Sequence, residues 1–255
     1  MTERSKARRL AQRCLPRPSR RALPLVHALA VVVVGAFAAT ASWAGVVNAT
    51  YEAPTERYGH GILGDAIEWG ALRIETEDGR ALRFSLPQTH VFEDVAPRLI
   101  DVDLDGDNEV VVVETFIPQG ARLAIYDERG LVAATPYIGR THRWLAPLGG
   151  ADLDGDGSLE LAYIDRPHLA KTLMIWRFEN GTLTKVAQQD GLTNHRIGER
   201  DIAGGISTCG ETPVIVMANA NWTRVIGARF DGSRISTRDL GPHQNRDSFQ
   251  RHLSC

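Results

Sequence analysis

Two acidic segments of the sequence have the composition and spacing of loops that gather oxygen ligands. Carboxylates occupy positions 1, 3, 5 and 9 of each segment, and a glycine at position 6 permits a sharp turn. Position 7 would offer its backbone carbonyl, and hard oxygen donors in a flexible loop select calcium over zinc or copper. The predicted ligands of two calcium ions are Asp101, Asp103, Asp105, Asp107 and Glu109 in the first segment, and Asp152, Asp154, Asp156, Ser158 and Glu160 in the second.

Two other interpretations of these segments were weighed. A solvated turn without metal is the first, and converging carboxylates argue against it because they repel one another unless a cation lies between them. An EF-hand is the second, and it needs an acid at position 12 between two helices. That position holds Val112 in one segment and Tyr163 in the other, each within a β-type run, which excludes an EF-hand. We expect weak calcium affinity, on the order of 10⁻⁴–10⁻³ M, as in extracellular modules.

The elements that position these segments belong to an internal repeat. Turn glycines between apolar runs recur at Gly79, Gly130, Gly181 and Gly232, a constant shift of 51 residues that the two acidic segments share. An acidic residue or asparagine near such a glycine, between β-type runs, is a hairpin signal. Each repeat is therefore predicted to have four strands, one before the acidic segment (residues 145–151 in the third copy), one after it, and two in the hairpin.

Repeats of this length and composition predict an all-β fold. Four-stranded units of about 40–50 residues are typical of propeller blades. Residues 45–255 are accordingly predicted to form a β-propeller domain of four blades, with a closed four-bladed ring favoured over an open ring or one completed by a second chain. The first and fourth copies keep the hairpin but lack the acidic segment.

The acidic segments resemble a known family, the FG-GAP or VCBS repeats found in the propeller of integrin alpha chains. The residues that carry the resemblance are 101–112 and 151–162, and the similarity extends over about residues 95–190. The Phe-Gly and Gly-Ala-Pro signatures are absent, and residues 149–151 come nearest to them. The resemblance implies a β-propeller with calcium loops on one rim of the blades, which serves in adhesion proteins and as an appendage of enzymes.

Residues 1–44 have the layout of a secretory signal peptide. They hold eight basic residues and one acid before the apolar run 28–41, and Ser42 and Ala44 would be positions −3 and −1 of a cleavage site. An uncleaved anchor over residues 24–44 is the alternative, and it would be the only membrane contact. Either places the body outside the cytoplasm, periplasmic or secreted. That body has a net charge of −9, which argues against nucleic-acid binding.

Two of the three cysteines, Cys209 and Cys255, follow this leader. Thiols oxidise outside the cytoplasm, and a bond between these two would close a loop of about 46 residues and stabilise the fold by about 4 kcal/mol in the chain-entropy model. Two unpaired thiols are the alternative. We expect the disulfide.

Histidines with neighbouring arginines recur after the hairpins at nearly the repeat spacing. Equivalent positions of a propeller lie on one face, where arginine would bind an anionic ligand. The alternative is that each histidine bonds within its own loop. The candidate ligand face comprises His90, His142, Arg143, His195, Arg196 and His243.

The sequence favours a binding module over an enzyme. It contains no Gly-x-Ser-x-Gly elbow, HExxH, P-loop or CxxC motif. The competing hypothesis is a hydrolase that uses the His/Arg face, with Glu199 and Asp201 as the nearby acids. The sequence leaves the ligand or partner protein unidentified.

Overall fold

The computed structural model describes residues 44–255, which form seventeen β-strands in antiparallel sheets and one short helix. The all-β prediction is therefore confirmed. The predicted leader up to residue 43 lies outside the described residues. Among residues 44–255, no helix has the length and apolar character needed to span a bilayer.

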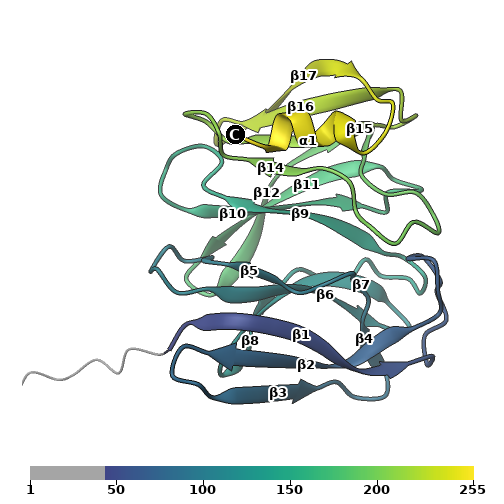
Figure 1. The fold of residues 1–255 in the computed structure, drawn as a ribbon, viewed down its shortest axis with the longest axis vertical. Coiled ribbons are helices and arrows are strands. Elements are labelled where there is room, and N and C mark those ends of the chain that lie inside the picture. Colours follow the sequence, from purple (N-terminus) through teal and green to yellow (C-terminus); the bar gives the residue numbers. More distant parts are fainter. Residues whose placement is uncertain (1–43) are drawn as a thin grey trace, which may run out of the picture. The chain divides into compact units, whose positions relative to one another are not determined.

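The strands fall into four groups, one for each hairpin glycine, and the groups follow one another in chain order (Figure 1). The first group has three strands, whereas four were expected. The first two groups comprise β1 (Val46–Thr55), β2 (Glu68–Thr76) and β3 (Ala81–Ser85), then β4 (His90–Phe92), β5 (Arg98–Ile100), β6 (Glu109–Phe116), β7 (Gly120–Asp127) and β8 (Gly130–Ala134).

The third and fourth groups repeat the pattern, with the innermost strand of the fourth divided in two. They comprise β9 (Leu145–Ala151), β10 (Leu159–Asp165), β11 (Thr172–Glu179) and β12 (Thr182–Asp190), then β13 (Leu192–Thr193), β14 (Gly205–Ser207), β15 (Val214–Asn219), β16 (Arg224–Phe230) and β17 (Ile235–Pro242).

The predicted hairpins are present at the predicted positions. Gly79, Gly130, Gly181 and Gly232 each have a positive φ, between 72° and 124°, at or beside the turns that join the last two strands of their groups. Glycine adopts such angles without the clash that a Cβ atom brings. The groups are less separate than expected, because β4 pairs with β2 at Trp69 and Phe92 and so joins the first two groups in one sheet.

Alternation along the central strands builds a core between each pair of neighbouring groups. On β6, Val110 and Val112 pack toward the first group, whereas Val111 and Val113 pack toward the third. Both faces are therefore buried, which explains why this strand is a continuous apolar run instead of an alternating one. The strand β10 does the same between the second and fourth groups, with Ile164 on one face and Leu161 on the other.

The two end groups have different outer faces. Opposite the buried Leu72 and Ile74, β2 carries Arg73 and Glu75, an exposed ion pair of 3.0 Å. The outer face of the last group is covered by α1 (Asp247–Leu253), whose buried Phe249 packs with Val216.

The C-terminus is fixed to this last group. Cys209 and Cys255, which the sequence analysis pairs, form a disulfide with their Cα atoms 5.2 Å apart. Helix α1 and the disulfide thus occupy the side of the fourth group on which a further sheet would pack. A closed four-bladed ring is not confirmed.

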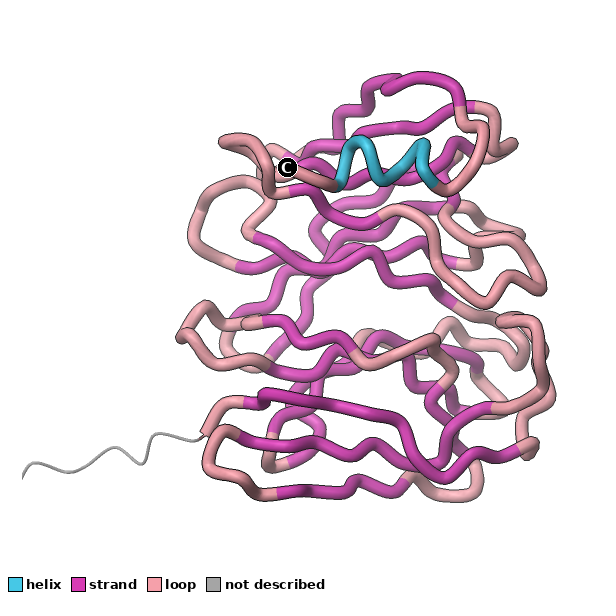
Figure 2. Tube along the Cα trace, viewed as in Figure 1, coloured by secondary structure: helices cyan, strands magenta, loops and turns pink. Residues whose placement is uncertain are grey.

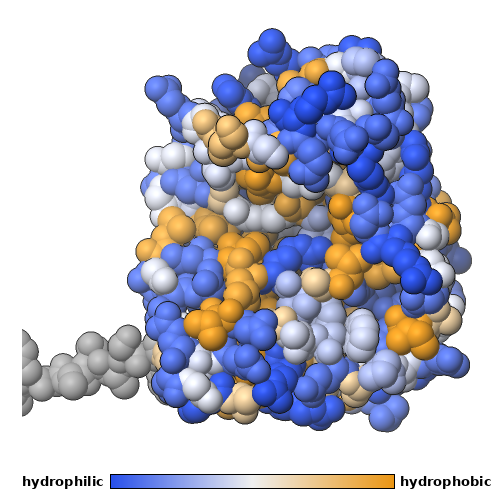
Figure 3. Space-filling view, in the orientation of Figure 1, coloured by the Kyte–Doolittle hydropathy of each residue, from blue (hydrophilic) through white to orange (hydrophobic). Residues whose placement is uncertain are grey.

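Antiparallel strands send alternate loops to opposite ends of the sheets. The two acidic loops and the glycine hairpins lie at one end, and the loops that carry the predicted His/Arg face lie at the other, so the loops gather on two sides in Figure 2. Figure 3 shows one face of the molecule, where apolar surface gathers around β5 and β9 and the residues over α1 and β17 are mostly hydrophilic.

Candidate functional site

Each acidic segment forms the loop between two antiparallel strands of its group that pair with each other. The first loop joins β5 to β6 and the second joins β9 to β10. In each loop, three carboxylates place one oxygen apiece within 4.8 Å of one another. This separation fits oxygens on opposite sides of a calcium ion, which binds each at about 2.4 Å. The converging residues are Asp101, Asp103 and Glu109 in the first loop and Asp152, Asp154 and Glu160 in the second.

The first carboxylate of each loop also holds the turn. The Oδ1 and Oδ2 atoms of Asp101 accept hydrogen bonds from the backbone of Asp105 (3.1 Å) and Gly106 (3.0 Å). Asp152 does the same with Gly155 (2.7 Å) and Gly157 (3.0 Å). The bond from Gly106 recurs 51 residues later at Gly157, so the repeat extends to this internal hydrogen bond. The other bond comes from the fifth residue of the first loop and from the fourth residue of the second.

The last carboxylate of each loop is bonded on one oxygen and directed into the cluster with the other. Glu109 Oε2 accepts a hydrogen bond from Val102 N at 2.9 Å, and Glu160 Oε2 accepts one from Leu153 N at 2.9 Å. In both cases the glutamate lies at the start of the strand that follows the loop, and the strand holds its backbone in place. The second oxygen, Oε1, is the one that could contact a cation, and in Glu160 it accepts a hydrogen bond from Arg177 at 2.6 Å.

The remaining predicted ligands do other work in the structure. Asp105 Oδ1 accepts a hydrogen bond from Asp107 N (2.9 Å), and Asp156 Oδ1 accepts one from Ser158 N (2.9 Å). The Ser158 hydroxyl donates to Glu179 at 3.4 Å. The Asp105 and Asp156 side chains thus stabilise the turns, to which Asp107 and Ser158 contribute backbone donors. All four residues lie outside the two converging clusters.

Crowding of like charges is evident in the first loop. Burial, and to a lesser extent the nearby Asp103 and Asp105, raise the pKa of Glu109 to about 7. Burial and Asp105 also raise the pKa of Asp103. Proximity of carboxylates disfavours their charged forms, and a bound cation would reverse this effect. The donor set therefore fits calcium.

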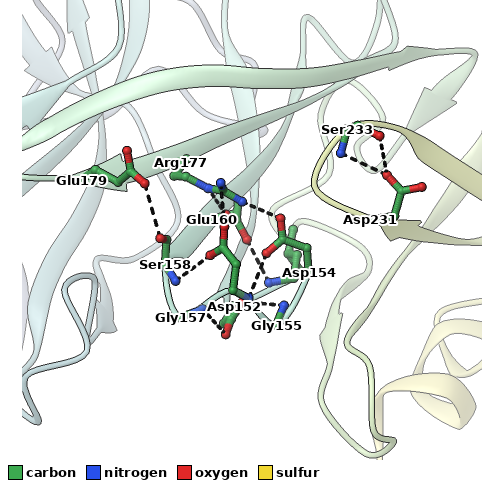
Figure 4. Close-up of polar contacts among 12 residues, drawn as sticks. Asp152, Asp154, Gly155, Gly157, Ser158, Glu160, Arg177, Glu179, Asp231 and Ser233 are labelled. Carbon is green, nitrogen blue, oxygen red and sulfur yellow. Dashed lines mark hydrogen bonds and ion pairs between the residues drawn. The ribbon is translucent and has the colours of Figure 1, made fainter.

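The second loop contains a cation supplied by the protein itself. Arg177, from β11, reaches into the loop (Figure 4). Its guanidinium donates to Glu160 Oε1 (2.6 Å) and to Asp154 Oδ2 (2.5 Å). It also pairs with Asp156 Oδ2 at 2.8 Å. The Arg177 side chain is only 16% exposed, so its pairs with the buried Asp154 and Glu160 side chains are shielded from water, whereas Asp156 is 42% exposed.

The first loop has no equivalent of this arginine at the repeated position. The residue 51 positions earlier is Tyr126 on β7, whose hydroxyl donates to Glu114 at 2.7 Å instead of entering the loop. Arg129, which donates to Asp127 Oδ2 at 2.6 Å, lines the hollow beside the first loop. Sequence reasoning missed Arg177 because only the register of β10 on β11, which pairs Glu160 with Arg177, brings the two together.

At the opposite end, the structure brings together only part of the predicted ligand face. His142 and Arg143 line a hollow of about 270 Å³. His195 lies behind this hollow, fully buried, with its ring edge-on to Trp144 at 4.9 Å. It bonds to His168 at 3.1 Å and to the backbone oxygen of Glu199 at 2.9 Å.

The other members of the predicted face lie apart from this hollow. His90 stacks on Phe116 at 4.7 Å between ring centres. Arg196 lies over the ring of Trp222 at 4.3 Å, and His243 meets the same ring edge-on at 5.3 Å. The structure thus forms two clusters of these side chains, with His90 outside both.

The hollow also contains a histidine that sequence reasoning missed. His60, on the loop between β1 and β2, stacks on His142 at 5.0 Å and bonds through Nδ1 to the buried Glu93. The Glu93 carboxyl also accepts a hydrogen bond from Thr115 at 2.6 Å. Burial raises the pKa of Glu93 to about 8 and lowers that of His60 to about 4. His60 lies on a long loop outside the repeat, so its position had no signal in the spacing.

The two acids of the hydrolase hypothesis are engaged by a third residue. Arg246 donates to Glu199 Oε2 at 2.6 Å and to Asp201 Oδ1 at 3.0 Å. Both carboxylates therefore lie in ion pairs at the surface beside α1.

Together, the antiparallel groups of strands and the acidic loops of the second and third groups define a β-rich repeat protein. A sequence model described as an FG-GAP-like repeat matches residues 101–163, which span both acidic loops, the strands β6 to β9 and most of β10. The chain therefore contains an FG-GAP-like repeat, as the resemblance indicated. Comparison with the curated proteins finds no match.

Proposed function

We propose that residues 45–255 form an exported calcium-binding module that acts by binding a ligand or a protein, without catalysis. The observation that carries this proposal is the convergence of three carboxylates in each of two loops that share a repeat. The FG-GAP-like match over the same residues supports a propeller-like binding module.

The proposed metal is calcium, with one ion in each loop. All converging donors are carboxylate oxygens, which calcium prefers and which zinc and copper do not. In the first loop the ion would relieve the repulsion that raises the pKa of Glu109. In the second loop the ion would have to displace Arg177, so we expect weaker binding there.

The proposed architecture is a set of four propeller-type blades. The shared hairpins and the buried faces between neighbouring groups support it. Helix α1 on one outer face and the Arg73–Glu75 pair on the other favour an open arrangement over the closed ring. A ring completed by a second copy would require the outer faces of both the first and the last group to be free to pack against that copy.

The proposed location is outside the cytoplasm, in the periplasm or secreted. The basic and apolar segment 1–44 resembles an export signal. The disulfide between Cys209 and Cys255 is stable in an oxidising compartment and rare in the cytosol.

The proposed role is binding, because the identified acids serve other purposes. The loop carboxylates are assigned to calcium, and Glu199 and Asp201 pair with Arg246. The hydrolase remains the alternative, and His60 with its Glu93 partner is the observation in its favour. Loss of a hydrolytic activity in the H60A variant, with folding intact, would establish that alternative.

The calcium proposal is tested by thermal unfolding of the purified protein in chelator and in calcium. Calcium that binds only the folded state raises Tm, by an amount equivalent to about 2.7 kcal/mol at one hundred times Kd. The D103N variant, which lacks a converging carboxylate, should lose much of this shift. D107N is the matched control, because its side chain lies outside the cluster. An equal shift in D103N and D107N, or no shift in the wild type, would refute the assignment.

A further inference from the structure

The hollow lined by His142 and Arg143, at the end of the sheets opposite the two acidic loops, is built from segments far apart in the sequence. The loop between β1 and β2 contributes His60 and Ile62, the segment before β9 contributes residues 142–144, and the turn between β10 and β11 contributes residues 166–169. The last wall is Ile197, after β13. Gly198 N donates to the backbone oxygen of Ile62 at 3.1 Å, which fixes the loop of the first group against the fourth.

The walls of this hollow are largely apolar and part of them is rigid. Trp144 is buried, and its indole N–H donates to the backbone oxygen of Glu93 at 2.8 Å. At the rim lie Leu169 and Ile197, which are 62% and 70% exposed. Large apolar side chains this exposed beside a concave site are typical of a surface that binds something.

One guanidinium in the hollow lacks a carboxylate partner among the described residues. Arg143 donates to the backbone oxygen of His142 at 2.8 Å, and this is its one hydrogen bond there. The neighbouring Arg166, by contrast, is neutralised by a two-pronged contact with Asp165 at 2.7 to 3.1 Å. The hollow therefore offers one uncompensated positive charge.

The three histidines that line the hollow are neutral at neutral pH, because burial lowers the pKa of each. Burial lowers the pKa of both His60 and His168 to about 4. Burial raises the pKa of Glu93, behind His60, to about 8, so this carboxyl holds its proton. No anionic group inside the hollow therefore compensates the positive charge of Arg143, and the histidines add no further charge.

We propose that this hollow binds a small organic monocarboxylate with an apolar or aromatic body. Arginine pairs with a carboxylate through two parallel hydrogen bonds, which orients the ligand as well as attracting it. The apolar body would lie against Trp144 and the exposed rim. A single free guanidinium among apolar walls favours this class over inorganic phosphate, which carries more charge and has no apolar surface. The inference rests on the proposed role as a binding module, but not on calcium.

The test is calorimetric titration of the purified protein with phenylacetate, 4-methylpentanoate and the neutral phenylacetamide. We expect saturable binding of at least one carboxylate, with phenylacetamide at least about tenfold weaker, because a hydrogen bond to a charged group is worth about 1.5–3 kcal/mol. The R143Q variant should lose about tenfold or more in affinity. R229Q is the matched control, because Arg229 is an exposed arginine of β16 that lies outside the hollow, and its removal should leave affinity unchanged.

A second variant separates the apolar part of the site from its charge. I197S removes exposed apolar surface and should weaken phenylacetate while leaving the fold intact, since Ile197 is 70% exposed. Three results would overturn the proposal: no saturable binding of either carboxylate, equal affinity in R143Q and the wild type, or tighter binding of inorganic phosphate than of phenylacetate. The calcium-dependent Tm shift, measured on the same samples, reports the calcium proposal separately.

Discussion

Arg177 makes the second acidic loop a test of whether a protein cation and calcium compete for one position. Its guanidinium pairs with Asp154, Asp156 and Glu160 at 2.5 to 2.8 Å. The Glu160 side chain is fully buried, whereas Asp156 is 42% exposed and its pair is screened by water. Removing one partner of a buried ion pair costs about 3–5 kcal/mol, and the partial exposure places this case near about 3 kcal/mol.

The perturbation is R177Q in the D103N background, which disables the first loop so that calcium reports only the second. In chelator, R177Q should lower the free energy of unfolding by about 3 kcal/mol, because three carboxylates lose their counter-charge. In R177Q, calcium no longer has to displace the guanidinium. The free energy of about 3 kcal/mol that Arg177 contributes in the wild type should therefore be gained by calcium binding. At 1.4 kcal/mol per decade, calcium should bind about one hundredfold more tightly.

The assay is urea unfolding in chelator and in saturating calcium, combined with calorimetric titration of calcium. The stability lost in R177Q should be largely restored by calcium, whereas R229Q, which removes an exposed arginine from β16, should show neither effect. A loss of stability in R177Q that calcium does not restore, with no gain in affinity, would show that the second loop is an ion-pair cluster and not a cation site.

Three further predictions follow from the fold. Removing the disulfide by C209S and C255S together should lower the free energy of unfolding by up to about 4 kcal/mol, measured by urea denaturation against reduced wild type as control. F249A should cost about 3–5 kcal/mol by the same method, because this buried side chain covers the last sheet; an effect under about 1 kcal/mol would show that the helix is not part of the core. Burial raises the pKa of Glu68 to about 9 from 4.5, so the folded state retains a proton that the unfolded state releases, and stability is lost as pH rises through this range. E68Q should therefore gain stability relative to wild type between about pH 6 and pH 9, by up to about 1.4 kcal/mol per pH unit, and a constant difference in Tm across this range would contradict the assignment.

The sequence was sufficient to predict the repeat because local chemistry determines it. Gly130 and Gly181 mark hairpins that need positive φ, and the acids at Asp101 and Asp152 close their own loops through bonds to backbone a few residues away. Interactions of this kind recur at the repeat spacing. They are therefore readable from one chain without knowledge of its tertiary contacts.

The features that were not predicted depend on contacts between distant segments. Arg177 enters the second loop through strand pairing, and His60 reaches Glu93 across a separation of 33 residues. Helix α1 is only seven residues long, too short for a helical apolar period to be recognised in the sequence. Four repeats of equal length predict a closed ring. The residues on the outer faces of the first and last groups, such as α1, lie outside the repeat pattern and favour an open arrangement.

The central claim, that the acidic loops are cation sites, is tested most directly by counting bound calcium. Flow dialysis with radioactive calcium, at up to about 10 mM free ion, gives the number of ions per chain without depending on stability. The account predicts two ions for the R177Q protein and none when D103N and D154N are added to it. No calcium bound by R177Q, or the same number after both carboxylates are removed, would contradict it.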